Sequence, residues 1–212
     1  SIQPDTEFKN LEKKIYCSQF IIGEYDEKIP SNLTAEQILI RSGNIGSVRI
    51  AQKVGLESFQ KFLNDLGLLN TLDFDIEEIG TPLKINWGKC KLATSAYGHG
   101  VTTTPIQLAK GYSIISNGGY DIKPTLILDK KKREIRYQKI ISEEVSKKIN
   151  LALRKIVTTK EGTASFANIN GYEIGGKTGT AQKSNAGGYS NMKINTFASI
   201  FPTSDPKYVL IV

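Results

Sequence analysis

Capping residues and the spacing of apolar positions together mark five helices. At Thr34 and Thr104 a threonine is followed three residues later by a glutamine, which is the capping box of a helix start. Apolar residues recur at intervals of three and four over residues 59–66, where one helical face would be buried. Gly55 and Gly67 are natural stops for two helices that would end at Val54 and Leu66. The pattern predicts helices over residues 34–40, 45–54, 59–66, 104–117 and 142–156.

The second half of the chain contains several short apolar and β-branched segments that are bounded by turn residues. Segments of this kind are typical of strands, and they predict strands over residues 122–128, 134–138, 172–178, 194–201 and 207–212. The connections at 182–192 and 202–206 are rich in Gly, Asn, Ser or Pro, as turns require. Helices followed by a meander of strands indicate an α+β domain in which an antiparallel sheet packs against helices.

The organisation of the chain predicts one incomplete domain. Residues 1–30 are mixed and turn-rich, and we expect residues 1–25 to be peripheral; residues 70–103 are expected to be loop-rich. Residues 208–212 are interpreted as a strand that stops within the core, so we expect residues 1–212 to be a fragment of a longer protein, incomplete at both ends. At 212 residues the chain is long enough to bury one sizeable core.

Composition excludes several classes of site. The net charge is +7, from 28 basic and 21 acidic residues, which favours anionic partners without naming one. Cys17 and Cys90 are too few for a disulfide scaffold or a four-cysteine zinc site; one bond between them is open, but two buried free thiols are favoured. His99 is the only histidine, which argues against a multi-histidine metal site, and between two glycines we expect it to be structural or to lie at the rim of the groove. No apolar run approaches the ~18 residues of a transmembrane helix.

The segment Gly176-Lys177-Thr178-Gly179-Thr180 carries the sharpest chemical signal, and two interpretations of it compete. Residues 171–178 fit the phosphate-binding loop pattern G-x-x-x-x-G-K-[ST] letter for letter. That motif needs a helix after its lysine, whereas residues 178–188 form helices poorly. The alternative is the K-T-G strand of penicillin-recognising serine enzymes. In that strand a lysine ammonium and a threonine hydroxyl suit a substrate carboxylate, and the glycine leaves room for a ligand backbone.

A second motif, Ser42-Gly43-Asn44, matches the S-x-N element that accompanies such a strand. It lies between two predicted helices, where a loop can direct a hydroxyl and an amide into a cleft. A serine hydroxyl beside a lysine can relay a proton to a leaving amine. Taken alone, the tripeptide is a weak signal that favours a simple helix-connecting turn, but it precedes Lys177 by 135 residues, in the order that these enzymes use. We therefore expect Ser42 and Asn44 to face Lys177 across one cavity.

With these motifs the chain resembles the transpeptidase domain of class B penicillin-binding proteins. Three further segments resemble the family's Y-G-x-G, T-P-x-Q-x-A and N-G-G stretch: Tyr97-Gly-His-Gly100, Thr104-Pro-Ile-Gln-Leu-Ala109 and Asn117-Gly-Gly119. The resemblance covers nearly all of residues 25–212 and implies a β-lactamase/transpeptidase-like fold. Residues 187–189 and the strand at 197–201 are more similar to the septal, cell-division enzyme than to the elongation type.

The resemblance implies peptidoglycan D,D-transpeptidation. A serine attacks D-Ala-D-Ala of one stem peptide, D-Ala leaves, and an amine of a neighbouring stem peptide takes the acyl group; β-lactams acylate the same serine. By matching position, Ser42 would relay a proton, Asn44 would hold the substrate amide, and Lys177 would set the electrostatics. Thr178 and Thr180 would line the site of the substrate carboxylate, the Thr180 N–H would be one oxyanion donor, and Gly179 would leave room for the substrate backbone.

The same resemblance implies a set of partners and a location. Peptidoglycan stem peptides and β-lactams are the expected ligands, and divisome membrane proteins are candidate partners. No nucleic acid, metal or cofactor is expected. The intact protein would carry an inner-membrane anchor outside this chain, with the domain itself in the periplasm.

The family's nucleophile is not at its expected place in this chain. It lies in an S-x-x-K tetrad several tens of residues before S-x-N, and none of the 41 residues before Ser42 forms that tetrad. The tetrads that begin at Ser58, Ser190 and Ser204 do not fit the family order and are interpreted as chance. We therefore expect the 212-residue chain to be inactive by itself and unlabelled by a fluorescent penicillin. A β-lactam-sensing or non-catalytic interaction domain on the same fold is the alternative function, and a phosphate-loop nucleotide binder is a remote one.

Overall fold

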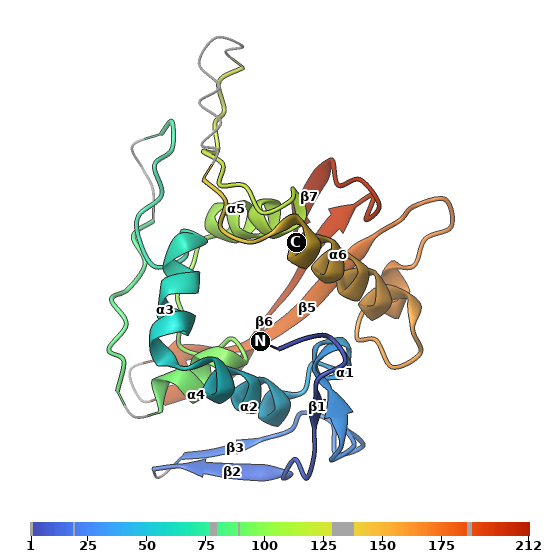
Figure 1. The fold of residues 1–212 in the computed structure, drawn as a ribbon. Helices are drawn as coiled ribbons and strands as arrows, with labels where there is room; N and C mark the ends of the chain where they lie inside the picture. Colours follow the sequence, from blue (N-terminus) through green and yellow to red (C-terminus); the bar gives the residue numbers. More distant parts are fainter. Residues whose placement is uncertain (1, 19, 77–79, 89, 129–137, 186–187) are drawn as a thin grey trace.

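The computed structural model describes residues 2–212 except 19, 77–79, 89, 129–137 and 186–187 (Figure 1). In chain order the elements are β1 (Glu7–Phe8), β2 (Lys14–Cys17), β3 (Phe20–Gly23), β4 (Leu33–Thr34), α1 (Ala35–Arg41), α2 (Asn44–Val54), α3 (Leu56–Asp65), α4 (Lys91–Ala96), α5 (Pro105–Ser116), α6 (Glu143–Thr158), the short 3-10 helix η1 (Ser165–Ala167), β5 (Gly175–Asn185), β6 (Gly188–Phe201) and β7 (Tyr208–Ile211).

The main sheet is antiparallel and has the strand order β5-β6-β7. Its register pairs Lys177 with Ala198 and Ala198 with Ile211. Helix α6 packs against β5, and α5 packs against β6 and β7. The two remaining sheets, β1-β4 and β2-β3, have two strands each. In Figure 1 the β2-β3 sheet lies on the side of α2 that is away from the main sheet. The arrangement confirms the predicted α+β fold with an antiparallel sheet packed against helices.

The five predicted helices are present, and capping chemistry accounts for three of their starts. Thr34 and Thr104 each accept a hydrogen bond from the backbone N–H of the glutamine three residues on, and that glutamine bonds back to the threonine N–H. Ser142 caps α6 through the Val145 N–H. Helix α4 is an addition, because residues 70–103 were expected to form loops. It has six residues and no side-chain cap, so nothing local in the sequence marks it.

The strands depart further from expectation. Residues 122–128 form no strand; an isolated bridge between Tyr120 and Lys139 is the pairing described there, and most of the predicted 134–138 strand lies outside the described residues. The segment 182–192 was expected to be a connection, whereas β5 continues to Asn185 and β6 begins at Gly188. The backbones of paired strands satisfy each other whatever their side chains, so polar Gly-, Asn- and Ser-rich composition did not prevent a long hairpin.

Two apolar clusters form the core, and α1 contributes to both. The first consists of Leu11, Ile22, Ile29, Leu33, Ile38, Ile45, Val48 and Ala93. The second consists of Ile40, Leu153, Ile156, Val157, Ala164, Ala167 and Ile200. Leu11 and Ile22 are buried in the first cluster, so two residues of the N-terminal segment contribute to the core. Helix α1 is thus held on two sides just before Ser42, which fixes the position of the next residues.

Cys17 and Cys90 form a disulfide, so the prediction of two free thiols was wrong. Cys17 ends β2 and Cys90 precedes α4. Helix α2 packs against both β3 and α4, and this common neighbour brings the two Cα atoms to 5.6 Å, within the usual range of a disulfide. The cysteines are 73 residues apart in the chain, and only the packing of α2 makes them neighbours.

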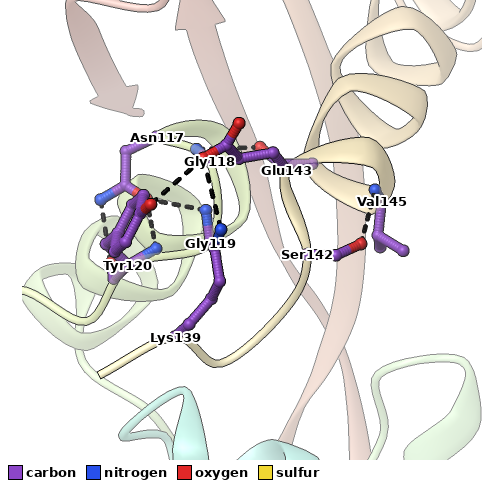
Figure 2. Close-up of polar contacts among 9 residues, drawn as sticks. Asn117, Gly118, Gly119, Tyr120, Lys139, Ser142, Glu143 and Val145 are labelled. Carbon is purple, nitrogen blue, oxygen red and sulfur yellow. Dashed lines mark hydrogen bonds and ion pairs between the residues drawn. The ribbon is translucent and has the colours of Figure 1, made fainter. Parts of the chain in front are cut away.

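The turn after α5 is built by one asparagine side chain (Figure 2). The Asn117 Oδ1 atom accepts hydrogen bonds from the N–H groups of Gly119 and Tyr120, while its Nδ2 donates to the Tyr120 carbonyl. Tyr120 and Lys139 both bond the carboxylate of Glu143 in the first turn of α6. The Asn-Gly-Gly segment therefore sets how α5 is joined to α6, which in turn packs against β5.

Candidate functional site

Ser42 and Lys177 lie in direct contact although they are 135 residues apart. The Lys177 Nζ donates a hydrogen bond to the Ser42 Oγ at 2.7 Å and another to the Thr178 carbonyl at 2.8 Å. Ser42 is the C-cap of α1, and Lys177 is the third residue of β5. The predicted meeting of these two residues is confirmed.

The backbone of Ser42 adopts an uncommon conformation that aims its hydroxyl at β5. Its φ and ψ are 57° and 40°, in the left-handed region that residues other than glycine seldom occupy. Its own N–H closes α1 by donating to carbonyls of the last turn. A strained cap of this kind costs of order 1–3 kcal/mol, so the surrounding packing has to hold it.

Lys177 is a half-buried lysine beside neutral groups. In the described part of the chain its hydrogen-bond partners are a hydroxyl and a carbonyl, and no carboxylate forms an ion pair with it. Burial lowers the pKa of Lys177 from its ordinary 10.5 to about 8. Near neutral pH this residue can therefore exist in both protonation states, which suits proton transfer to or from the Ser42 hydroxyl.

Lys177 is expected to titrate near pH 8, which NMR of specifically labelled lysine side chains would measure. Because the unfolded chain keeps this proton to a higher pH than the folded protein, the contribution of Lys177 to the unfolding free energy should rise between about pH 8 and pH 10.5. Denaturant unfolding of Lys177→Met should lack that rise. A titration near 10.5 would contradict the burial argument.

Asn44 is held by the β2–β3 hairpin. Its Nδ2 donates to the Gly23 carbonyl at 2.9 Å, and its backbone N–H donates to the Glu24 carboxylate at 2.7 Å. No described contact uses its side-chain carbonyl oxygen. The structure thus fixes Asn44 beside Ser42 at the first residue of α2, but it shows no contact between Asn44 and Lys177.

The residues after Lys177 continue the strand toward solvent. The Thr178 hydroxyl donates to the Thr163 hydroxyl at 2.8 Å, and the exposed Thr180 hydroxyl donates to its cross-strand neighbour Asn195 at 3.1 Å. Gly179 is exposed, and a Cβ there would meet only ordinary contacts with Thr196. The protein itself therefore does not require a glycine at this position.

Sequence reasoning did not identify Glu24, Gly23 or Thr163, although each contacts a predicted site residue. The two hairpin contacts cross 20 and 21 residues of chain, and no local motif marks them. His99, expected to be structural, packs its ring against Tyr97 at 4.8 Å between centroids, and burial lowers its pKa.

The structure removes two competing interpretations of the motifs. Lys177 lies inside a strand that runs from Gly175 to Asn185, so no helix follows it and the phosphate-loop hypothesis is wrong. Among the late S-x-x-K tetrads, Lys61 and Lys207 form ion pairs with Asp65 and Asp205 instead of contacting their serines. The described residues also contain no cluster of acidic, histidine or cysteine side chains able to hold a metal.

Comparison with known proteins agrees with these motifs. The family model described as the penicillin binding protein transpeptidase domain matches residues 1–212. Stage V sporulation protein D of Bacillus subtilis is 36% identical over 191 residues, covering 83% of this chain and 29% of that protein. The peptidoglycan D,D-transpeptidase FtsI homolog of Mesostigma viride is 32% identical over 209 residues, covering 85% and 35%. The chain thus spans about a third of the length of these relatives.

Solved structures share the fold. The transpeptidase domain of penicillin-binding protein 3 from Burkholderia pseudomallei superposes with a TM-score of 0.89 at 23% identity, over 99% of this chain and 64% of that one. Penicillin-binding protein 3 of the tuberculosis mycobacterium, complexed with ampicillin, gives 0.86 at 24% identity, over 98% and 50%. Together with the family match over all 212 residues and the contact between Ser42 and Lys177, these likenesses show that the chain belongs to the penicillin-binding protein transpeptidase domain family.

Proposed function

We propose that the protein carrying this chain is a serine-type peptidoglycan D,D-transpeptidase and a penicillin target, acting in septal cell-wall synthesis. The observation that supports it most directly is the hydrogen bond from Lys177 to Ser42, which joins the S-x-N turn to the K-T-G strand. The nucleophile of this reaction would come from an S-x-x-K tetrad that is absent from residues 1–41. This chain would then supply two walls of the site.

In this proposal each wall has its own task. The Ser42–Lys177 pair passes a proton toward the departing amine, since a hydroxyl and an amine of lowered pKa are already hydrogen-bonded. Asn44 presents its free carbonyl oxygen to the substrate amide. Residues 178–180 receive the substrate carboxylate along the exposed part of β5.

The proposal is tested by labelling with a fluorescent penicillin. The full-length protein should form a stable acyl adduct, and the isolated 212-residue chain should not. Turnover of a D-Ala-D-Ala thioester by the full-length protein then separates an enzyme from a β-lactam-sensing domain, which would be acylated without turnover of that substrate. A folded full-length protein that takes up no label would refute the proposal.

Location and partners are part of the same proposal. The disulfide between Cys17 and Cys90 supports an oxidising compartment such as the periplasm, because such bonds rarely persist in the cytosol. None of the helices in the described ranges is long and apolar enough to cross a bilayer, and we propose that a membrane anchor and divisome partners belong to the full-length protein. Fractionation of cells expressing that protein, with and without carbonate extraction, measures the anchoring.

Gly179→Val should lower penicillin acylation of the full-length protein at least about tenfold while leaving the fold intact. The Cβ of a side chain at this position would lie 3.9 Å from its nearest neighbour, which is an ordinary contact. A valine would fill the space that a ligand backbone needs beside an edge strand. Acylation kinetics and the thermal midpoint would be measured together, and an unchanged rate would show that no ligand approaches this glycine.

A further inference from the structure

The first turn of α2 is capped by a carboxylate from a distant part of the chain. Glu24 follows strand β3, and its Oε2 accepts the Asn44 N–H at 2.7 Å while its Oε1 accepts the Ile45 N–H at 3.0 Å. Glu24 is half-buried. Both carboxylate oxygens are therefore committed to the helix that begins within the Ser42-Gly43-Asn44 turn.

This helix has no cap of its own. Its N-cap is Gly43, which has no side chain, and no acidic residue lies in its first turn. The first N–H groups of a helix have no partner inside the helix, and a carboxylate is a strong acceptor for them because the helix dipole adds to the hydrogen bonds. Glu24 thus supplies the hydrogen-bond acceptor that the residues at the start of α2 lack.

The hairpin that carries Glu24 is itself fixed in place. Ile22 is buried in the first core cluster with Ile15 packed against it, and the disulfide ties Cys17 to the residue before α4. Gly23, next to Glu24, accepts the Nδ2 hydrogen bond of Asn44. Gly23 and Glu24, where the chain leaves the hairpin, therefore accept three hydrogen bonds from Asn44 and Ile45. These bonds hold the backbone of both residues and the side chain of Asn44.

The opposite side of the turn faces β5. Ser42 lies two residues before Asn44 and accepts the hydrogen bond from Lys177. The strained backbone of Ser42 needs support from its surroundings, and α1 supplies part of it by accepting the Ser42 N–H. Helix α2 starts two residues after Ser42, and Glu24 accepts the first two N–H groups of that helix.

We propose that Glu24 is a positioning residue, which holds the start of α2 so that Ser42 faces Lys177 and Asn44 faces the substrate. Its place in the reaction rests on the function proposed above. Glu24→Gln keeps the size of the side chain but leaves one oxygen and places an NH₂ against a backbone N–H. Glu24→Asp keeps the negative charge on a side chain that is one methylene shorter.

The experiment compares full-length variants at a temperature well below the unfolding midpoint of each. Glu24→Gln should slow acylation by a penicillin about tenfold and speed hydrogen exchange of the peptide containing Asn44 and Ile45 about tenfold. Glu24→Asp should recover part of both. Glu57→Gln is the matched control, because Glu57 lies exposed in the first turn of α3, away from the turn, and it should change neither.

The outcomes distinguish a failure of the role proposed for Glu24 from a failure of the proposed transpeptidase function. Wild-type exchange at Asn44 and Ile45 in Glu24→Gln would overturn the cap, and wild-type acylation by a folded Glu24→Gln would overturn the positioning role. Equal slowing by Glu57→Gln would also overturn it, since the effect would then belong to any lost helix-terminal charge. If the wild-type protein is not acylated at all, the transpeptidase proposal fails, and the exchange measurement alone decides whether Glu24 holds the turn.

Discussion

Replacing Lys177 by alanine in the full-length protein is expected to slow acylation by a penicillin about 10²- to 10³-fold. The substitution removes the amine that donates to Ser42 at 2.7 Å and leaves that hydroxyl without its proton partner. It also removes a cation from β5. Stopped-flow or gel-based acylation kinetics of purified variants would measure the effect.

Two further variants sharpen this prediction. Lys177→Arg keeps the positive charge, but a guanidinium does not release its proton near neutral pH, so the rate should stay low if the residue transfers protons. Lys207→Ala is the control, since Lys207 is exposed and paired with Asp205 at the turn before β7. A folded Lys177→Ala protein that is acylated as fast as the wild type would remove Lys177 from the reaction.

The double replacement Cys17→Ser with Cys90→Ser is expected to lower the unfolding free energy by about 4 kcal/mol. The bond closes a loop of 73 residues, and the chain-entropy model gives larger effects for longer loops. Urea unfolding of the oxidised protein and the double variant would measure the difference. We expect the variant to retain the hairpin in the folded state, because Ile22 remains buried beside α2.

Reductant supplies the internal control for this second prediction. Dithiothreitol should destabilise the wild-type protein toward the value of the double variant and should leave the variant itself unchanged. Equal unfolding midpoints for the oxidised wild type and the variant would mean that the bond contributes no stability. In that case the tertiary contacts of the hairpin alone would hold β2 and β3 in place.

The helices were the part of the fold that the sequence predicted well. Thr34 and Thr104 start helices because their hydroxyls and the following glutamines satisfy backbone groups within four residues. The strands were predicted less well, because a strand gains its hydrogen bonds from a partner elsewhere in the chain. Residues 122–128 have strand-like composition but no partner strand among the described residues, whereas the polar residues up to Asn185 have one in β6.

In the candidate site, too, features that depend on neighbouring residues were predicted better than contacts between distant ones. The motif at 176–180 and the turn at 42–44 were recognisable because their residue types and order are tied to one chemistry. Their order along the chain led us to expect Ser42 and Lys177 on one cavity, but it did not indicate the contact made by Glu24, whose carboxylate reaches α2 across 20 residues. The disulfide was missed for the same reason, since 73 residues separate its cysteines.

The sequence by itself determined the capped starts of three helices, the candidate residues for chemistry and the family that the chain resembles, because all of these depend on neighbours a few positions apart. Only the tertiary structure decided that Lys177 donates a hydrogen bond directly to Ser42, that Cys17 is bonded to Cys90 and that the Glu24 carboxylate accepts the first N–H groups of α2. Those contacts depend on α2 packing against β3 and α4, and on α1 packing against α2 and against α6, which in turn packs against β5. That packing arises from buried surface contributed by the whole chain, which no local pattern contains.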